Sequence, residues 1–323
     1  MMYDVQAKSA VRMLNGNYLV AGTQAFANGF LTVHTPQGQA FQATFLSQGA
    51  LSSFSEFNQI TKINDTLAII GGKISLAVGP SEIWQGISMA VNQQGQALWA
   101  LTHSISDPGM DATVRDIERI NDTSFFVLTS GISGISNSLS KITASGNVLW
   151  TTSYDSNVNG FQLNDLCVVD STLFLCGSIF SLGNFSGILM KVDASGNFIE
   201  GSKYDHTVQP DFIQVIPQHG AIILANRGHA MESVDVMKMD FNGTVIAQKT
   251  YQGGMSMPED LATKPLSVID SATCWYWRGS GFGSYAHRIE SMNLLPTQTL
   301  MHYGNIQTLM EGDTSITILS AGP

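Results

Sequence analysis

The stretch Leu163–Tyr204, which reads LNDLCVVDSTLFLCGSIFSLGNFSGILMKVDASGNFIEGSKY, decides the fold of this chain. It contains four short apolar or alternating runs, and Asp, Ser, Asn and Gly residues separate one run from the next. Such runs, bounded by turn-forming residues, are typical of β-strands joined by tight hairpins. The stretch therefore predicts a four-stranded unit, whose strands we call A to D in chain order.

The turn between strands A and B recurs along the whole sequence. Each copy follows the previous one after about 50 residues, a period that is typical of four-stranded propeller blades. The turn markers of the seven copies are Gly16, Asp65, Asp122, Ser171, Gly220, Ser271 and Gly312. We therefore expect an all-β protein with the architecture of a β-propeller, forming a single domain over residues 1–323.

The number of blades depends on the C–D hairpins. Five of these hairpins turn on a glycine, namely Gly38, Gly95, Gly146, Gly196 and Gly243, and a sixth carries Pro296 instead. A glycine supplies the positive φ that a tight hairpin needs. Because the chain ends after a seventh A–B hairpin, the last blade is incomplete. We favour seven four-stranded blades, with the N-terminal MYDVQA (2–7) helping to close the last one. The alternative is six blades with residues 305–323 appended.

Three segments of the chain carry a family resemblance. ITASGNVLWTTSY (142–154) and MKVDASGNFIEGSKY (190–204), together with NDLCVVDSTLFLCGS (164–178), resemble the SGN-x-LW repeats of bacterial β-propeller repeat proteins. The resemblance implies a propeller architecture and a secreted, surface-associated or particle-associated setting. Repeats of this type occur in proteins of many activities, so the resemblance carries no catalytic residue.

Composition narrows the classes of partner. Of the residues, 44% are hydrophobic and 12% charged, and the formal net charge is −10 with 15 Lys and Arg. A nucleic-acid or anionic-membrane surface needs a basic face, and the sequence predicts none. No apolar run approaches the roughly 20 residues of a membrane span, and the chain as given begins without a signal-peptide core. An extracellular, surface or particle-associated location is favoured over a cytoplasmic one.

The three cysteines, Cys167, Cys176 and Cys274, are too few for a disulfide scaffold and lack metal-ligand spacing. Cys167 and Cys176 lie on consecutive strands of one hairpin. A bridge between them requires a turn centred on Ser171 and Thr172, and we favour reduced thiols buried among apolar side chains.

The A–B and C–D turns are short, whereas the B–C and D–A connections contain nearly all the long segments, among them 73–86 and 104–113. Functional residues concentrate on loops that a rigid scaffold holds, so the B–C/D–A face is the candidate surface for a protein or glycan partner. The candidate ligand-binding residues on this face are Trp84, Arg227, Arg278, His206 and His229.

An acidic residue precedes strand A in four repeats, at Asp116, Asp165, Asp211 and Asp260. Four carboxylates that gather near the mouth of a central channel could hold Ca²⁺, which prefers oxygen ligands. Recurrence in successive repeats favours a structural role for them, in which each accepts hydrogen bonds from the backbone of a neighbouring blade.

Arg227 and Arg278 end strand B in successive repeats. Antiparallel pairing predicts that Arg227 lies near Asp211 and Arg278 near Asp260, as ion pairs within a blade. The alternative is that both guanidinium groups bind an anionic ligand. His206 and His229 lie in connections of adjacent repeats, where solvated surface positions are the ordinary expectation.

The sequence thus favours a non-enzymatic binding or assembly module, without a cofactor, that recognises a protein or glycan through its B–C/D–A face. The alternative is a glycan-active hydrolase or lyase with acidic residues at the channel mouth. A panel of glycan and ester substrates distinguishes the two.

Overall fold

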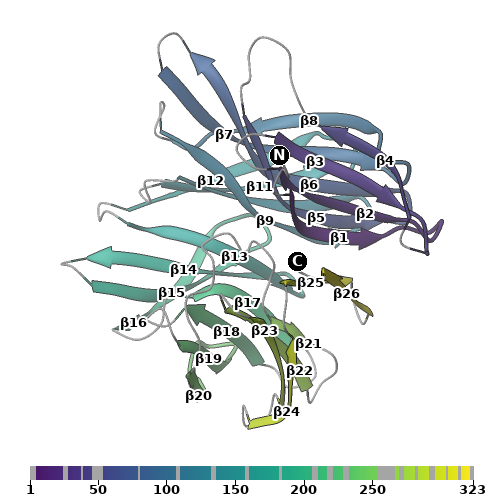
Figure 1. Ribbon diagram of the computed structural model, residues 1–323. Helices are drawn as coiled ribbons and strands as arrows, with labels where there is room; N and C mark the ends of the chain where they lie inside the picture. Colours follow the sequence, from purple (N-terminus) through teal and green to yellow (C-terminus); the bar gives the residue numbers. More distant parts are fainter. Residues whose placement is uncertain are drawn as a thin grey trace. The chain divides into compact units, whose positions relative to one another are not determined.

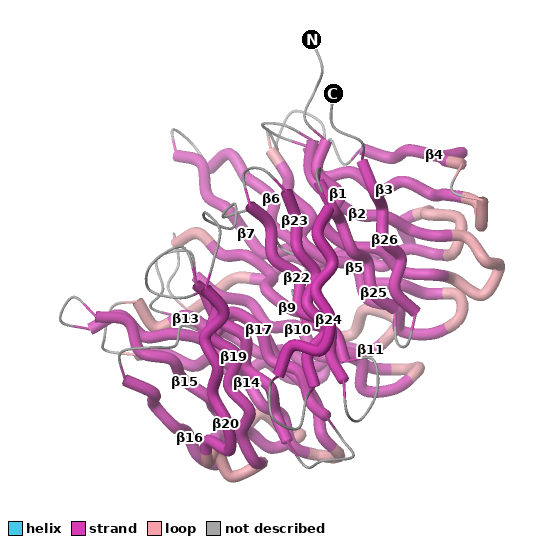
Figure 2. The backbone as a smooth tube through the Cα atoms, turned by 60° about the horizontal axis from the view of Figure 1, so that its bottom comes forward, coloured by secondary structure: helices cyan, strands magenta, loops and turns pink. Residues whose placement is uncertain are grey.

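The computed structural model describes the backbone of residues 5–24, 28–37, 39–45, 54–78, 81–106, 110–131, 136–156, 160–181, 184–205, 210–216, 221–227, 233–252, 266–268, 273–280, 283–290, 295–302, 305–311 and 314–320. Side chains are described in stretches within 7–204 and in 237–248. The chain divides into two compact units, Met1–Asn157 and Val158–Pro323. The described residues form strands and turns throughout, without a helix (Figure 2).

The first unit contains three four-stranded antiparallel sheets, each built from consecutive strands and coloured purple to teal in Figure 1. Their strands are β1 (Val5–Arg12), β2 (Tyr18–Gln24), β3 (Asn28–His34) and β4 (Ala40–Phe45); β5 (Ser55–Asn64), β6 (Leu67–Val78), β7 (Ser81–Asn92) and β8 (Ala97–His103); and β9 (Ala112–Asn121), β10 (Ser124–Gly131), β11 (Ser136–Thr143) and β12 (Val148–Asp155).

The second unit contains three further four-stranded sheets and one hairpin, each also built from consecutive strands. Their strands are β13 (Gln162–Val169), β14 (Thr172–Ser181), β15 (Asn184–Asp193) and β16 (Phe198–Asp205); β17 (Pro210–Ile216), β18 (Ala221–Arg227), β19 (Ser233–Asp240) and β20 (Val245–Gln252); β21 (Leu266–Val268), β22 (Thr273–Ser280), β23 (Gly283–Glu290) and β24 (Leu295–His302); and β25 (Asn305–Glu311) with β26 (Thr314–Ser320).

These meandering sheets confirm the four-stranded repeat that the sequence predicts. The chain is an all-β protein built of propeller-type blades, each with strands A to D in chain order. Residues Val5–Ala7 of the N-terminal segment pair with β2 in the first sheet. The prediction that this segment completes the last blade is therefore not what the strand pairing shows, because these residues already serve as strand A of the first blade.

The core of each blade lies on its inner strands. Every residue of β10 is buried, whereas β12, the last strand of the same sheet, alternates between exposed and partly buried side chains up to Tyr154. In the first unit, buried side chains of β5, β6, β9 and β10, among them Ile63, Ile69, Ile117 and Phe125, form one cluster shared by two neighbouring sheets. Apolar contact between blades therefore holds adjacent sheets together.

Turn geometry follows the predicted residues. Four of the C–D turn glycines have positive φ, namely Gly95 at 76°, Gly146 at 88°, Gly196 at 82° and Gly243 at 81°. Gly38 lies outside the described residues. The A–B turn of the fourth blade centres on Asp170 and Ser171, because Val169 pairs with Thr172.

This register places Cys167 opposite Phe174 and not opposite Cys176. Both thiols are free and buried, and they pack with Leu189, Met237 and Met239. The prediction of reduced, core-packed cysteines is confirmed for this pair, while the side chain of Cys274 lies outside the described set.

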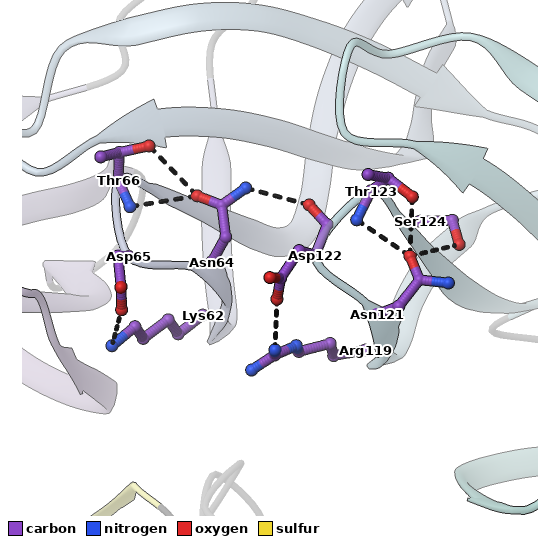
Figure 3. Close-up of polar contacts among 9 residues, drawn as sticks. All are labelled: Lys62, Asn64, Asp65, Thr66, Arg119, Asn121, Asp122, Thr123 and Ser124. Atoms are coloured by element: carbon purple, nitrogen blue, oxygen red, sulfur yellow. Dashed lines mark hydrogen bonds and ion pairs between the residues drawn. The ribbon is translucent and has the colours of Figure 1, made fainter.

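Two neighbouring A–B turns in the first unit share one sequence pattern, Lys62-Ile-Asn-Asp-Thr66 and Arg119-Ile-Asn-Asp-Thr123 (Figure 3). In each turn the Asn side-chain oxygen accepts the Thr backbone N–H, at 3.0 Å in the first and 2.9 Å in the second. The Nδ2 of Asn64 then donates to the carbonyl of Asp122 in the next blade, at 3.0 Å. The turns therefore both close their own hairpins and join adjacent blades.

A β-bulge recurs in strand A at the same place in five blades. Strand A has one extra residue there, while the residues before and after it pair with consecutive residues of strand B. The bulged residues are Lys8, Asn58, Arg115, Asn164 and Asp211. A bulge of this kind turns every following side chain to the opposite face, so it sets which residues of strand A enter the core.

Candidate functional site

Among the described residues of the first unit, the second blade carries an extension that the first and third blades do not show. Strands β6 and β7 pair with each other as far as Val78 and Ser81, whereas β5 follows β6 only to Ile74 and β8 follows β7 only to Gly86. The two strands therefore continue past their sheet as a two-stranded ribbon, which we call the arm (residues 75–85 without 79 and 80; Figure 1). The segment 73–86, predicted as a long B–C loop, is instead mostly strand, because its residues keep cross-strand pairing.

Trp84 stands at the base of the arm, where its register partner is Ser75. Its partly buried indole lies beside Phe54, with ring centroids 6.3 Å apart and tilted by 32°. The ammonium of Lys73 lies 4.4 Å from the centroid of the indole. A cation at this distance over an aromatic face is attracted by the ring quadrupole, so Lys73 and Phe54 together fix the indole in place.

Two acidic groups complete this cluster. Glu56, the register partner of Lys73 on strand β5, lies 3.2 Å from its ammonium. A carboxylate oxygen of Asp111 accepts the backbone N–H of Trp84 at 2.9 Å, and Asp111 directly precedes the first strand of the next blade. We call Phe54, Glu56, Lys73, Trp84 and Asp111 the arm-base cluster. It offers a partner an aromatic surface bordered by a carboxylate and an ammonium group.

The connection beside this cluster is held by side-chain hydrogen bonds. The carboxylate of Asp155, at the end of β12, accepts the hydroxyl of Ser106 at 2.7 Å and that of Ser136 at 2.5 Å. Ser106 belongs to the D–A connection between the second and third blades. The described part of this connection is therefore anchored to the third blade through Ser106.

His103 does not belong to this open surface, although the sequence places it in a connecting segment. It ends strand β8 and is buried, and its Nε2 lies 2.7 Å from the hydroxyl of Ser88, which is also buried. Burial lowers the pKa of His103 to about 4. The pair resembles a nucleophile and its base in composition alone, since Ser88 has no exposed surface for a substrate to reach.

Asp116 and Asp165 lie within strands β9 and β13 and not before them, and both are buried. A carboxylate oxygen of Asp116 accepts the backbone N–H of Ile117 at 2.9 Å. This contact lies within one strand, whereas the predicted structural role joins the carboxylate to a neighbouring blade. Among the side chains that the structure describes, no group of three or more His, Cys, Asp or Glu could hold a metal ion.

The strand register corrects two predicted equivalences. Asp211 lies in the bulge of β17, one place before the position that Asp116 and Asp165 occupy in their strands, and Phe212 takes that position instead. The register also leaves Asp211 beside Asn226 and not opposite Arg227.

Arg227 and Arg278 are likewise not equivalent. Arg227 is the last residue of β18. The pairing of β22 with β23 gives Arg278 the place in its blade that Asn226, and not Arg227, holds in the preceding blade. A one-residue difference changes the face of the sheet on which a side chain lies. The side chains of Arg227, Arg278 and Asp211 lie outside the described residues, and so do His206, His229 and Asp260 altogether.

The solved structures that resemble this chain differ in their descriptions, and one of them is named as a propeller. A Bacteroides caccae protein of unknown function matches with a TM-score of 0.56 at 10% identity, over 88% of this chain and 93% of its own. The Dos1 propeller matches with a TM-score of 0.58 at 10% identity, over 97% of this chain and 78% of its own. Hydrazine synthase of Kuenenia stuttgartiensis matches with a TM-score of 0.54 at 11% identity, over 92% and 83%.

At such identities the likeness concerns the fold alone, and it agrees with the blade architecture described above. No protein family and no curated protein matches the sequence. In the part of the chain that the structure describes, no helix has the length and hydropathy to cross a membrane. The chain is thus an all-β protein of the propeller type, and its candidate recognition site is the arm with the arm-base cluster.

Proposed function

We propose that this protein is a non-enzymatic binding module that recognises a protein partner through the B–C/D–A face of its first unit. The observation that carries the proposal is the arm, a two-stranded ribbon that outruns both neighbouring strands of its own sheet. An extended segment of a partner can pair with the free edge of such a ribbon through backbone hydrogen bonds.

The arm-base cluster supplies the specificity that backbone pairing lacks. Trp84 offers a large apolar surface whose orientation Lys73 and Phe54 fix, so little conformational entropy is lost when a partner packs against it. Glu56 retains enough exposure, 39% of its side chain, to accept a hydrogen bond or to pair with a partner's cation. Aromatic anchors with a polar border are typical of protein recognition sites.

A seven-bladed ring is part of the same proposal. The seven consecutive sheets, of which the last consists of β25 and β26, support seven blades over six with an appendage. Deleting residues 305–323 tests this count. If β25 and β26 belong to the ring, the deletion lowers the melting temperature of the whole domain. If they form an appendage, the melting temperature stays unchanged.

Selection of a displayed peptide library against the full-length protein tests the binding function. We expect extended peptides that bind wild type and lose affinity when residues 76–83 are replaced by a two-residue turn. Trp84→Ala is expected to weaken the same peptides about tenfold or more. Trp150→Ala provides the matched control, because Trp150 is partly buried on β12, away from the arm, and packs on Phe126.

Two results contradict the proposal. One is peptide binding that survives both removal of the arm and Trp84→Ala. The other is turnover of a glycan or ester substrate by wild type, which favours the hydrolase or lyase alternative.

A further inference from the structure

The outer strands of the blades expose apolar side chains in a regular pattern. Just after each C–D turn, strand D begins with two adjacent apolar residues, and in the described blades these are largely exposed. The exposed fractions are 56% for Leu98, 50% for Val148, 55% for Leu149, 60% for Phe198, 50% for Ile199, 42% for Val245 and 55% for Ile246. We call these seven residues the outer-strand pairs.

A second recurring bulge explains why these residues are exposed. Strand D contains one unpaired residue at the same place in successive blades, for example Leu98, Leu149, Ile199 and Ile246. Regular alternation would turn one of two adjacent residues toward the sheet's packed face. The bulge interrupts that alternation, so both residues of a pair stay on the surface.

The strands that carry the pairs are sheet edges. Strands β8, β12, β16 and β20 each pair with a single neighbour in their own sheet. Native proteins usually protect such edges with charged residues. Here the hairpins 93–102 and 144–154 contain no Asp, Glu, Lys or Arg at all. The recurrence and the lack of charge mark this edge as an interaction surface.

Neighbouring pairs are also held in a fixed relation within each unit. In the first unit, Nε1 of Trp99 in β8 donates to the carbonyl of Ala144 at 3.1 Å. Ala144 lies in the C–D turn that precedes Val148 and Leu149. In the second unit, the hydroxyl of Tyr204 in β16 donates to the carbonyl of Gly243 at 2.9 Å. Gly243 lies in the C–D turn that precedes Val245 and Ile246. Two adjacent blades thus present their pairs as one preformed surface.

We propose that this surface docks a second copy of the same chain, and that the protein self-associates through its outer-strand pairs. An uncharged apolar edge is complementary to a surface of the same kind, and the second and third blades provide one. The outer strands of the fourth and fifth blades carry their exposed pairs beside Glu200, Lys203 and Lys249. A twofold axis brings identical edge strands together antiparallel, so each copy buries the same pairs against the other. A stable interface needs about 800 Å² from each partner, which requires pairs from adjacent blades to act together.

The test is the mass of the full-length protein by sedimentation velocity over a wide range of concentration. Wild type is expected to associate in a concentration-dependent manner. Leu98→Lys with Leu149→Lys removes the first-unit surface, and Ile199→Lys with Ile246→Lys removes the second. We expect at least one double variant to raise the dissociation constant roughly tenfold or more.

Leu14→Lys is the matched control, since Leu14 is the most exposed large hydrophobic residue described, at 69%, yet lies in an A–B turn. It should associate as wild type does. Circular dichroism and thermal melting establish that each variant is folded. Should a Lys variant fail to fold, Leu98→Cys in the otherwise unchanged chain replaces it. It is expected to form a disulfide between copies on mild oxidation, and Leu14→Cys is not.

Three outcomes overturn the proposal. Wild type could remain monomeric at every concentration, both double variants could associate as tightly as wild type, or the control could lose association to the same extent. Binding of monomeric wild type to neutral lipid vesicles, lost in the Lys variants, would assign the same surface to a membrane instead.

Discussion

The hydroxyl of Ser88 and Nε2 of His103 lie 2.7 Å apart in the buried interior of the second blade. Burial removes water from the imidazole of His103, and this desolvation lowers its pKa from 6.5 to about 4. The folded protein therefore holds His103 neutral, whereas the unfolded chain binds a proton there once the pH falls below about 6.5. The contribution to stability is complete above pH 6.5 and is lost as the pH falls toward 4.

We therefore expect His103→Gln to reduce the loss of stability between neutral pH and pH 5 by about 2 kcal/mol. Denaturant unfolding of wild type and variant at neutral pH and near pH 5 measures the difference. Ser88→Ala is the informative companion. It removes the hydrogen bond, at about 1 kcal/mol, but leaves the burial that lowers the pKa of His103. If His103→Gln and wild type lose stability in parallel on acidification, the histidine is not the group responsible.

A second prediction concerns glycines at the strand-A bulge. A Cβ at Gly177 would lie 1.9 Å from the carbonyl oxygen of Gln162, and one at Gly72 would lie 1.9 Å from that of Glu56. Both neighbours are backbone atoms of the adjacent strand, so the strands must separate to admit a methyl group. We expect Gly177→Ala to destabilise the protein by about 3 kcal/mol or more.

Gly201→Ala provides the comparison, because its nearest neighbour is the exposed ring of Phe198 at 3.3 Å, a side chain that can move. We expect this change to be neutral or slightly stabilising, since glycine weakens a strand interior. Equilibrium unfolding of the two variants checks the difference, and equal losses would show that the close approach at the bulge is relaxed in solution.

These bulges mark where sequence reasoning about this chain succeeds and where it fails. The C–D turns are predictable because a positive φ at Gly95 or Gly196 leaves a local signature, namely glycine between two apolar runs. A bulge leaves no such signature. Asp211 lies in the bulge itself, whereas Asp116 and Asp165 follow it, and the sequence does not distinguish the two places. The bulge in strand D likewise exposes both Val148 and Leu149, although strict alternation would partly bury one of them.

The arm was missed for a related reason. Residues 73–86 fit a long loop as well as two strands, because local preferences do not say how far a hairpin continues beyond its neighbours. The identity of Trp84 as a candidate did follow from the sequence. Its partners Glu56 and Asp111 did not, since they come from two other segments of the chain that only the fold brings to Trp84 and Lys73.

A third prediction concerns the C–D turn of the fifth blade. The carboxylate of Asp240 accepts the backbone N–H groups of Thr244 at 2.8 Å and of Asn242 at 2.9 Å. These hydrogen bonds hold the pKa of Asp240 below its ordinary value, and the one from Thr244 has the largest effect. Its stabilising contribution is therefore present above the ordinary carboxyl pKa and is lost as the pH falls below that value.

Carbon-detected NMR titration of the Asp240 carboxyl group measures this pKa directly. Asn92 makes the same pair of contacts in the second blade, to Gln94 and Gln96, both at 3.0 Å. Asp240→Asn should therefore preserve the turn at neutral pH and remove its pH dependence, whereas Asp240→Ala should weaken the turn at every pH. A normal carboxyl pKa at Asp240 would mean that the two hydrogen bonds do not persist in solution.

The last prediction separates the two roles of Lys73, as partner of Glu56 and as the cation over Trp84. Lys73→Met keeps an unbranched side chain over the indole but removes the charge, and we expect it to lower stability by no more than about 1 kcal/mol. Trp84→Ala removes the half-buried ring itself and should cost about 2 to 3 kcal/mol of stability.

A double-mutant cycle between Lys73→Met and Glu56→Gln measures the ion pair alone, and its coupling energy should shrink at high salt. A coupling above about 2 kcal/mol would place this pair in a far drier environment than its exposure of 20% and 39% implies. In that event the arm-base cluster would be a part of the core, and its use as an open recognition surface would have to be abandoned.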